Sequence, residues 1–159
     1  MIDFSHLEHY RENNRLEAKK ALGGLPESMW ETYSAFANTL GGAILLGVEE
    51  YPDHSLHAVD LPDPAGILQD LWSTVNNSDC VSANILHDSD VWVEEITGKH
   101  IIVINVPQAK PKDRPVYVYG DPVNGIFLRS GEGDYRVSRE LYDLYEENRS
   151  VAIDIDRGV

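Results

Sequence analysis

The chain contains almost no cysteine and no long apolar stretch. Its one cysteine, Cys80, cannot form an internal disulfide, which fits a protein of a reducing compartment. The densest apolar run, residues 43–48, is the size of a strand, whereas a membrane-spanning helix needs about 20 apolar residues. The first residues also lack the basic and then apolar pattern of a secretion signal. We therefore expect a cytoplasmic protein without a membrane segment.

Positive charge is scarce as well. Thirteen Lys and Arg residues stand against 27 Asp and Glu, which gives a net charge of −14. Proteins that bind nucleic acid through its phosphates usually carry a basic surface, so this composition argues against broad binding. The basic residues are nevertheless grouped, within residues 11–20 and at Lys110, Lys112 and Arg114. Any contact with nucleic acid is therefore expected at one local basic groove.

The length and composition are those of one globular domain. The chain has 159 residues, of which 42% are hydrophobic and 25% charged, as in ordinary folded proteins. A chain of this length buries roughly 70% of its unfolded surface, enough for a sizeable core. Residues 140–156 form a strongly acidic end. We expect one domain over residues 1–147 and a C-terminal tail over residues 148–159.

Apolar side chains at helical spacing, with a cap or a breaker at the ends, predict the helices. The first runs from Pro26 to Leu40 and ends at Gly41 and Gly42, because glycine adopts the left-handed conformation of a helix end at little cost. Further helices are expected after Asp63, with Pro64 at the first position, after Ser138, and, as a short helix or an ordered arm, within residues 1–14.

Alternating or continuous apolar runs predict the strands. Residues 15–19 alternate, whereas residues 43–48 and 100–106 are continuous runs of the kind found in buried strands. Further strands are expected at residues 81–86, 91–96, 116–119 and 126–129, and the tail after Asn148 is expected as a short edge strand or a disordered end. Helices and strands alternate early and strand pairs follow, which predicts an α+β fold with a central mixed β-sheet flanked by helices.

Carboxylates are the main candidates for chemistry, since the chain has no phosphate-binding GxxxxGK loop, no GxSxG and no HExxH. Glu12 and Glu17 flank a basic segment, and Glu49 and Glu50 end the apolar run of residues 43–48. Clustered carboxylates supply the oxygen ligands that Mg²⁺ and Mn²⁺ prefer, and such ions support phosphodiester cleavage. Residues five apart share neither a strand face nor a helix face. Glu12 and Glu17 therefore converge only if the chain turns between them, and otherwise they are surface acids.

Two segments carry a resemblance to a known family. Residues 12–19 read ENNRLEAK, a glutamate followed after four residues by Glu-x-Lys, and residues 34–50 read SAFANTLGGAILLGVEE. Later pieces agree: an apolar strand that ends in Val106-Pro107, a proline-bearing loop, and a strand that ends in Arg129-Ser130-Gly131. Together they resemble the Schlafen-type, AlbA-like DNA-binding domain family over about residues 12–136.

The resemblance implies binding of DNA or RNA, commonly in the N-terminal module of bacterial transcriptional regulators. In the animal Schlafen members three carboxylates form a metal-dependent ribonuclease site, and they fall here on Glu12, Glu17 and Glu50. These three are the expected catalytic and metal-binding residues if the protein is a nuclease, with Mg²⁺ or Mn²⁺ as the cofactor. At Glu50 the nuclease members usually have aspartate, whose side chain is one methylene shorter. The expected phosphate contacts are Lys19, Lys110, Lys112, Arg114 and Arg129.

Three functions follow as hypotheses. The first is a nucleic-acid-binding module of a bacterial regulatory protein. The second is a metal-dependent endoribonuclease that uses Glu12, Glu17 and Glu50. The third is a protein-interaction or oligomerisation module, whose acidic helix after Ser138 binds a basic partner or a second copy of the chain. Asn38, within the family motif, is expected to bond to backbone groups rather than to a ligand.

Overall fold

A mixed four-stranded sheet forms the centre of the computed structural model, which describes the backbone of residues 2–156 and the side chains of residues 2–149. The strand order is β1-β2-β6-β5. The strands are β1 (Leu16–Lys19), β2 (Gly42–Leu46), β5 (Val91–Ile96) and β6 (Lys99–Val106). β1 is parallel to β2, and the other two pairs are antiparallel. The mixed sheet with helices confirms the predicted fold class.

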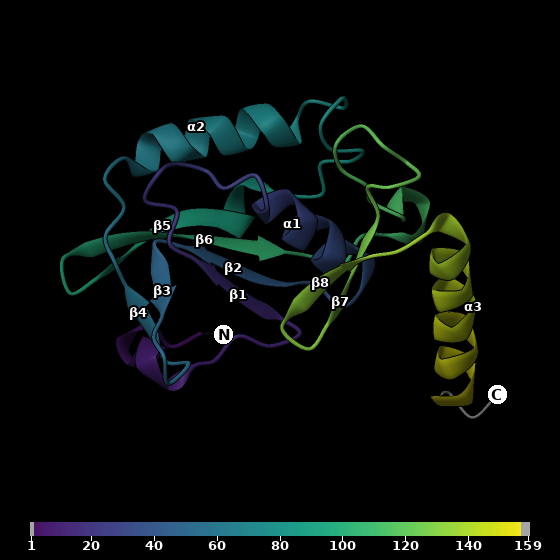
Figure 1. The fold of residues 1–159 in the computed structure, drawn as a ribbon, viewed down its shortest axis with the longest axis horizontal. Coiled ribbons are helices and arrows are strands. Elements are labelled where there is room, and N and C mark those ends of the chain that lie inside the picture. The colour runs from purple at the N-terminus through teal and green to yellow at the C-terminus, as the bar shows by residue number, and fades with distance from the viewer. Residues whose placement is uncertain (1, 157–159) are drawn as a thin grey trace.

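Helices α1 (Met29–Asn38) and α2 (Pro64–Val75) cover one face of this sheet (Figure 1). Alternate residues of β2 and β6, among them Ile44 and Ile104, pack against the helices in the larger core. The carboxylate of Asp63 accepts a hydrogen bond from the N–H of Gly66, so the predicted cap of α2 is confirmed. None of the helices among the described residues is long and apolar enough to span a membrane.

The other face of the sheet carries a smaller core. The remaining residues of β2 and β6, among them Leu45 and Val103, pack there against Leu7 and Leu56. Leu7 belongs to the short 3₁₀ helix η1 (Phe4–His9), which confirms a short helix in the N-terminal segment. Leu56 belongs to a hairpin of β3 (Val48–Glu50) and β4 (Leu56–Ala58).

A second hairpin, β7 (Phe127–Ser130) and β8 (Gly133–Arg136), packs against α1. The chain then enters α3 (Arg139–Asp156), where the hydroxyl of Ser138 accepts a hydrogen bond from the N–H of Leu141, as a capping residue does. Short 3₁₀ turns complete the fold at η2 (Asp88–Asp90) and η3 (Pro111–Asp113).

Three predictions about elements were wrong. The strand predicted at residues 81–86 does not form, and Val81 makes only an isolated bridge to Val118. Residues 116–119 likewise form only bridges, because the partner of β7 is β8, which was not predicted. The backbone after Asn148 is neither a strand nor irregular, since α3 continues to Asp156. The boundary expected at residue 147 therefore falls inside a helix.

Asn38, at the last position of α1, ties the helix to the segment that follows β6. Its amide donates to the carbonyl oxygens of Val116 at 2.9 Å and Phe127 at 3.1 Å, and its side-chain oxygen accepts from the N–H of Val116 at 2.8 Å. The side chain is fully buried, so no water competes for these bonds. This confirms that Asn38 bonds to backbone, although the backbone lies far along the chain and not in its own turn.

Replacing Asn38 is therefore expected to destabilise the fold. Asn38→Ala leaves buried backbone groups unpaired, at about 1–3 kcal/mol for each group that finds no new partner. Urea unfolding should show this loss, whereas Asn148→Ala, at an exposed position of α3, should change the stability by less than about 0.5 kcal/mol. Equal stability of the two variants would contradict the role given to Asn38.

Candidate functional site

The candidate site begins at a tight turn between Glu12 and β1. The side-chain oxygen of Asn13 accepts a hydrogen bond from the N–H of Arg15 at 2.7 Å, and the N–H of Asn13 donates to the carbonyl of Leu16 at 3.0 Å. The turn folds Glu12 back along the strand, where its carboxylate accepts from the N–H of Ala18 at 2.9 Å. Glu12 and Glu17 converge because the chain turns here, which is the condition that their spacing imposes.

Two further segments bring carboxylates to Glu12. The chain leaves β2 at Gly47, whose φ of +87° few other residues adopt, and β3 then presents Glu50. The tip of the β7–β8 hairpin presents Glu132. One carboxylate oxygen from each of Glu12, Glu50 and Glu132 lies within 4.8 Å of the other two. We call Glu12, Glu17, Glu50 and Glu132 the carboxylate cluster.

Arg129 holds this cluster in place from inside the protein. Its guanidinium donates to Glu17 at 2.9 Å and to Asp134 at 2.7 Å. The remaining N–H groups donate to the backbone carbonyls of Asn13 and Leu16. A guanidinium has five N–H donors, and these contacts occupy all of them. The side chain has no exposed surface, so Arg129 cannot contact phosphate from this position and the prediction that it does so is corrected.

Glu12 lacks such a cation, and its pKa reflects this. Burial, followed by the neighbouring carboxyl group of Glu17, raises the pKa of Glu12 to about 8, and Glu50 adds to the rise. The hydrogen bond from the N–H of Ala18 acts in the opposite direction. The carboxyl groups of Glu17 and Glu50 lie within hydrogen-bonding range of Glu12, so a proton on Glu12 relieves the repulsion among the three.

The cluster has the chemistry of a site for a hard divalent cation. Opposite oxygen ligands of Mg²⁺ or Ca²⁺ are about 4–5 Å apart, close to the spread of the oxygens of Glu12, Glu50 and Glu132. Such an ion favours carboxylate oxygens, and its charge would replace the proton that Glu12 holds. The residues present therefore fit the metal that the family resemblance implies. The fourth carboxylate, Glu17, is already paired with Arg129.

The predicted phosphate-binding residues do not form one groove. Arg114 is 10% exposed and pairs with Glu146 of α3, so it is a structural residue and its predicted phosphate contact is corrected. Lys19 donates to the hydroxyl of Ser28 at 3.2 Å, at the end of β1. Lys110 and Lys112 are exposed in the loop after β6, next to the opposite end of β2, because Val106 pairs with Gly42.

Sequence reasoning missed Glu132 and Asp134. Both belong to the β7–β8 hairpin, of which only the first strand was predicted. A turn signal was available in Gly131 and Gly133, which flank Glu132, and Gly131 has a φ of +57° that favours glycine. That the hairpin tip meets Glu12 depends on its packing against α1, which no local pattern encodes.

The raised pKa of Glu12 predicts how stability depends on pH. Between the ordinary pKa of 4.5 and the folded value of about 8, the folded protein binds more protons at Glu12 than the unfolded chain does. The stabilisation is therefore complete below pH 4.5 and is lost as the pH rises through about 8.

Urea unfolding in EDTA should show that Glu12→Gln gains stability relative to the natural protein as the pH rises across this window, because glutamine does not ionise. Glu147→Gln, at an exposed position of α3, should leave the pH dependence unchanged. Parallel pH profiles for the natural protein and Glu12→Gln would show that Glu12 ionises normally.

Two solved structures have a similar fold. A solution structure of the N-terminal domain of a RecG-related protein from Nitrosomonas europaea is 25% identical, with a TM-score of 0.59, and the match covers 86% of this chain and 94% of that one. A crystal structure of a protein from Corynebacterium diphtheriae is 17% identical with a TM-score of 0.54, over 83% of this chain and 23% of that one, and shows a likeness of fold alone. None of the curated proteins compared with the chain matches it.

The family comparison covers most of the chain. The family model described as Schlafen, AlbA_2 matches residues 12–138. This range includes the turn at Glu12, the β2–β3 segment and the β7–β8 hairpin, which together carry the whole carboxylate cluster. The chain therefore belongs to the Schlafen AlbA_2 family.

Proposed function

We propose that the protein is a nucleic-acid-binding module. Membership of the Schlafen AlbA_2 family over residues 12–138 carries this proposal. The likeness to the N-terminal domain of a RecG-related protein supports it, since the name of that protein relates it to the ATP-dependent DNA helicase RecG. That the module belongs to a bacterial transcriptional regulator stays a prediction, and so does its location in the cytoplasm.

The basic residues that are available to bind phosphate lie toward one end of the sheet, which favours contact with nucleic acid at one place on the protein. Lys110 and Lys112 are exposed, and neither makes an ion pair or a side-chain hydrogen bond within the described part of the chain. Arg15 is exposed and equally unpaired. These three basic residues lie toward the end of the sheet where Gly42 pairs with Val106, so a bound strand is expected to cross that end.

A binding titration tests the proposal. We expect the protein to bind tRNA, single-stranded RNA or duplex DNA with an affinity that falls as salt rises. Changing both Lys110 and Lys112 to glutamine should reduce the slope of log affinity against log salt by about 1 for each lysine. Lys99→Gln, at the opposite end of β6, is the matched control. The absence of salt-dependent binding to all three nucleic acids would falsify the proposal.

The carboxylate cluster favours a second candidate, a metal-dependent endoribonuclease. Glu12, Glu50 and Glu132 would hold the ion, which in such sites activates water and stabilises the leaving oxygen of a phosphodiester. Arg129 keeps the carboxylate of Glu17 next to Glu12. Glu17 is therefore placed to orient or deprotonate a group at the cluster rather than to bind the ion by itself.

Calorimetry with Mn²⁺ and an RNA cleavage assay test the second candidate together. Glu50→Gln and Glu132→Gln should weaken Mn²⁺ binding and lower cleavage by about 100-fold, because each removes a charged ligand. Glu49→Gln is the matched control, since Glu49 is the neighbour of Glu50 on β3 but forms an ion pair with Lys20 instead. Because Glu12 must lose its proton first, Mn²⁺ affinity should rise with pH up to about 8. If RNA cleavage is unchanged both by EDTA and by Glu17→Gln, the metal-dependent nuclease is excluded as a function.

Association through α3 stays a third prediction. Leu141 and Leu144 are 51% and 56% exposed, and within the described side chains of this acidic helix they are apolar groups that a partner would cover.

A further inference from the structure

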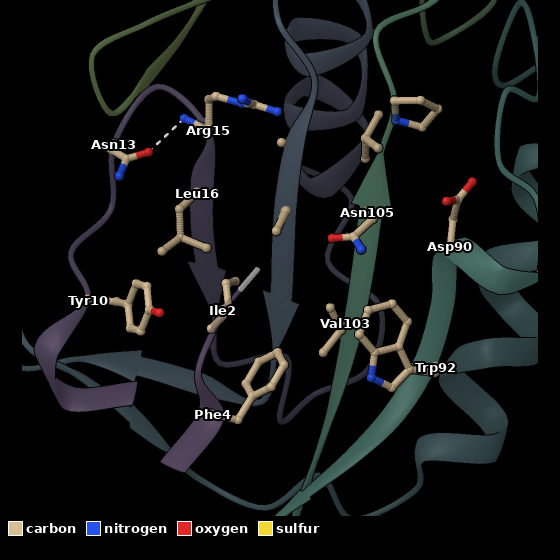
Figure 2. Close-up of a pocket in the computed structure, with 14 residues that line it drawn as sticks. Ile2, Phe4, Tyr10, Asn13, Arg15, Leu16, Asp90, Trp92, Val103 and Asn105 are labelled. Atoms are coloured by element: carbon tan, nitrogen blue, oxygen red, sulfur yellow. Dashed lines mark hydrogen bonds between the residues drawn. The ribbon is translucent and has the colours of Figure 1, made fainter. Parts of the chain in front are cut away.

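A hollow of about 700 Å³ lies on the face of the sheet that α1 and α2 leave open. Figure 2 shows Tyr10 and Phe4 along one side, Trp92 along the other, and Asn13 and Arg15 at one end. Pockets of roughly 300–1,000 Å³ suit a ligand the size of a drug molecule or a nucleotide. The hollow contains none of the carboxylates of the cluster.

The hollow exists because the central strand is poor in side-chain volume. Leu16, Ala43 and Asn105 stand side by side on β1, β2 and β6 and form the floor. Ala43 is the residue of β2 at this level of the sheet, so β2 contributes only a methyl group to the floor. The larger residues of the flanking strands and of the N-terminal segment then rise as walls around the small floor.

The aromatic walls are held in place by hydrogen bonds. The indole N–H of Trp92 donates to Glu94 at 3.1 Å, and the hydroxyl of Tyr10 accepts from the N–H of Asp3 at 2.8 Å. Both residues are only half-buried and line the hollow, so part of each ring remains accessible from it. Aromatic faces at the edge of a shallow groove are the surfaces on which unpaired bases stack.

Two polar side chains that line the hollow have no partner among the described residues. Within the described part of the chain, the guanidinium of Arg15 and the side-chain amide of Asn105 make no hydrogen bond, ion pair or ring contact. An amide offers a donor and an acceptor together, as the edge of a base requires, and a guanidinium pairs with phosphate. Asp90 stands across the hollow from Arg15 (Figure 2), so the charge is positive at one end and negative at the other.

We propose that this hollow binds one unpaired nucleotide of a single-stranded nucleic acid. The base stacks on Trp92, its edge meets the amide of Asn105, and the adjoining phosphate pairs with Arg15. Asp90 repels phosphate and so fixes the direction in which the nucleotide lies. The inference rests on the proposed nucleic-acid binding and names the form of nucleic acid that is bound. A duplex does not fit, because its bases are already stacked on one another.

A nucleic-acid strand bound at the hollow can leave it in two directions. Pro107 lines the hollow and leads into the loop that bears the exposed Lys110 and Lys112. On the other side, Arg15 and Asn13 belong to the turn that directly follows Glu12. A strand held at the hollow therefore passes from a basic loop toward the carboxylate cluster.

Fluorescence anisotropy with a short labelled single-stranded RNA, at low salt, tests the hollow. We expect Trp92→Ala and Ala43→Leu to weaken binding about tenfold, the first by removing a stacking surface and the second by filling the floor. Arg15→Gln should weaken binding and flatten its salt dependence. Trp72→Ala, on α2 beyond the opposite face, is the matched control and should bind normally. A duplex of the same sequence should compete poorly.

The outcomes separate the two proposals. If the natural protein binds no nucleic acid, the proposed function and this inference both fail. If it binds, but all three hollow variants bind as tightly as it does, the hollow is wrong and the proposed function stands. If only Trp92→Ala binds more weakly, while Ala43→Leu and Arg15→Gln bind normally, the proposal for the hollow is also overturned. Misfolding of Trp92→Ala alone would explain that result. Circular dichroism of each variant accompanies the titration.

Discussion

Arg129 is the residue on which the candidate site depends, because its buried guanidinium joins segments that are far apart in the sequence. It binds the turn at residues 13–16, the carboxylate of Glu17 on β1 and Asp134 on β8. Burying a cation is costly unless every donor finds a partner, and here the two carboxylates and the backbone carbonyls supply those partners. The same contacts fix the β7–β8 hairpin beside the turn. Glu132 can therefore stand close to Glu12 and Glu50.

This use of Arg129 leaves the cluster short of positive charge. Glu17 is neutralised by the guanidinium, but Glu12 is surrounded by acids and holds its proton to a pKa of about 8. A site that accumulates carboxylates without cations gains most from a divalent ion, which removes the repulsion that the proton removes otherwise. Part of the net charge of −14 is therefore concentrated locally, since four of the acids lie at a single site.

Under the proposed function, the remaining cations are the groups through which so acidic a protein would contact nucleic acid. Arg114 and Arg129 form internal ion pairs. The side chains of Arg15, Lys110 and Lys112 lie toward one end of the sheet and have no partner among the described residues. The aromatic hollow opens at that same end, between the basic loop and the turn at Glu12. Stacking surfaces bind bases without requiring a broad basic face, so a few well-placed cations are enough. Acidity elsewhere then limits binding to this one place.

The sequence by itself determined the elements that depend on local chemistry. Apolar spacing and caps predicted α1, α2 and the start of α3, and the continuous runs predicted β2 and β6, since these signals lie within a few residues of the structure they specify. The segments with glutamates 12, 17 and 50 were recognised through their resemblance to the family and not through local periodicity. Only tertiary structure decided which groups meet. Residues 81–86 read as a strand but make only an isolated bridge at Val81. Arg129 reads as a surface cation but is buried, and Glu132 joins the cluster through the packing of a hairpin on α1. Those outcomes depend on contacts between distant residues, which local periodicity does not carry.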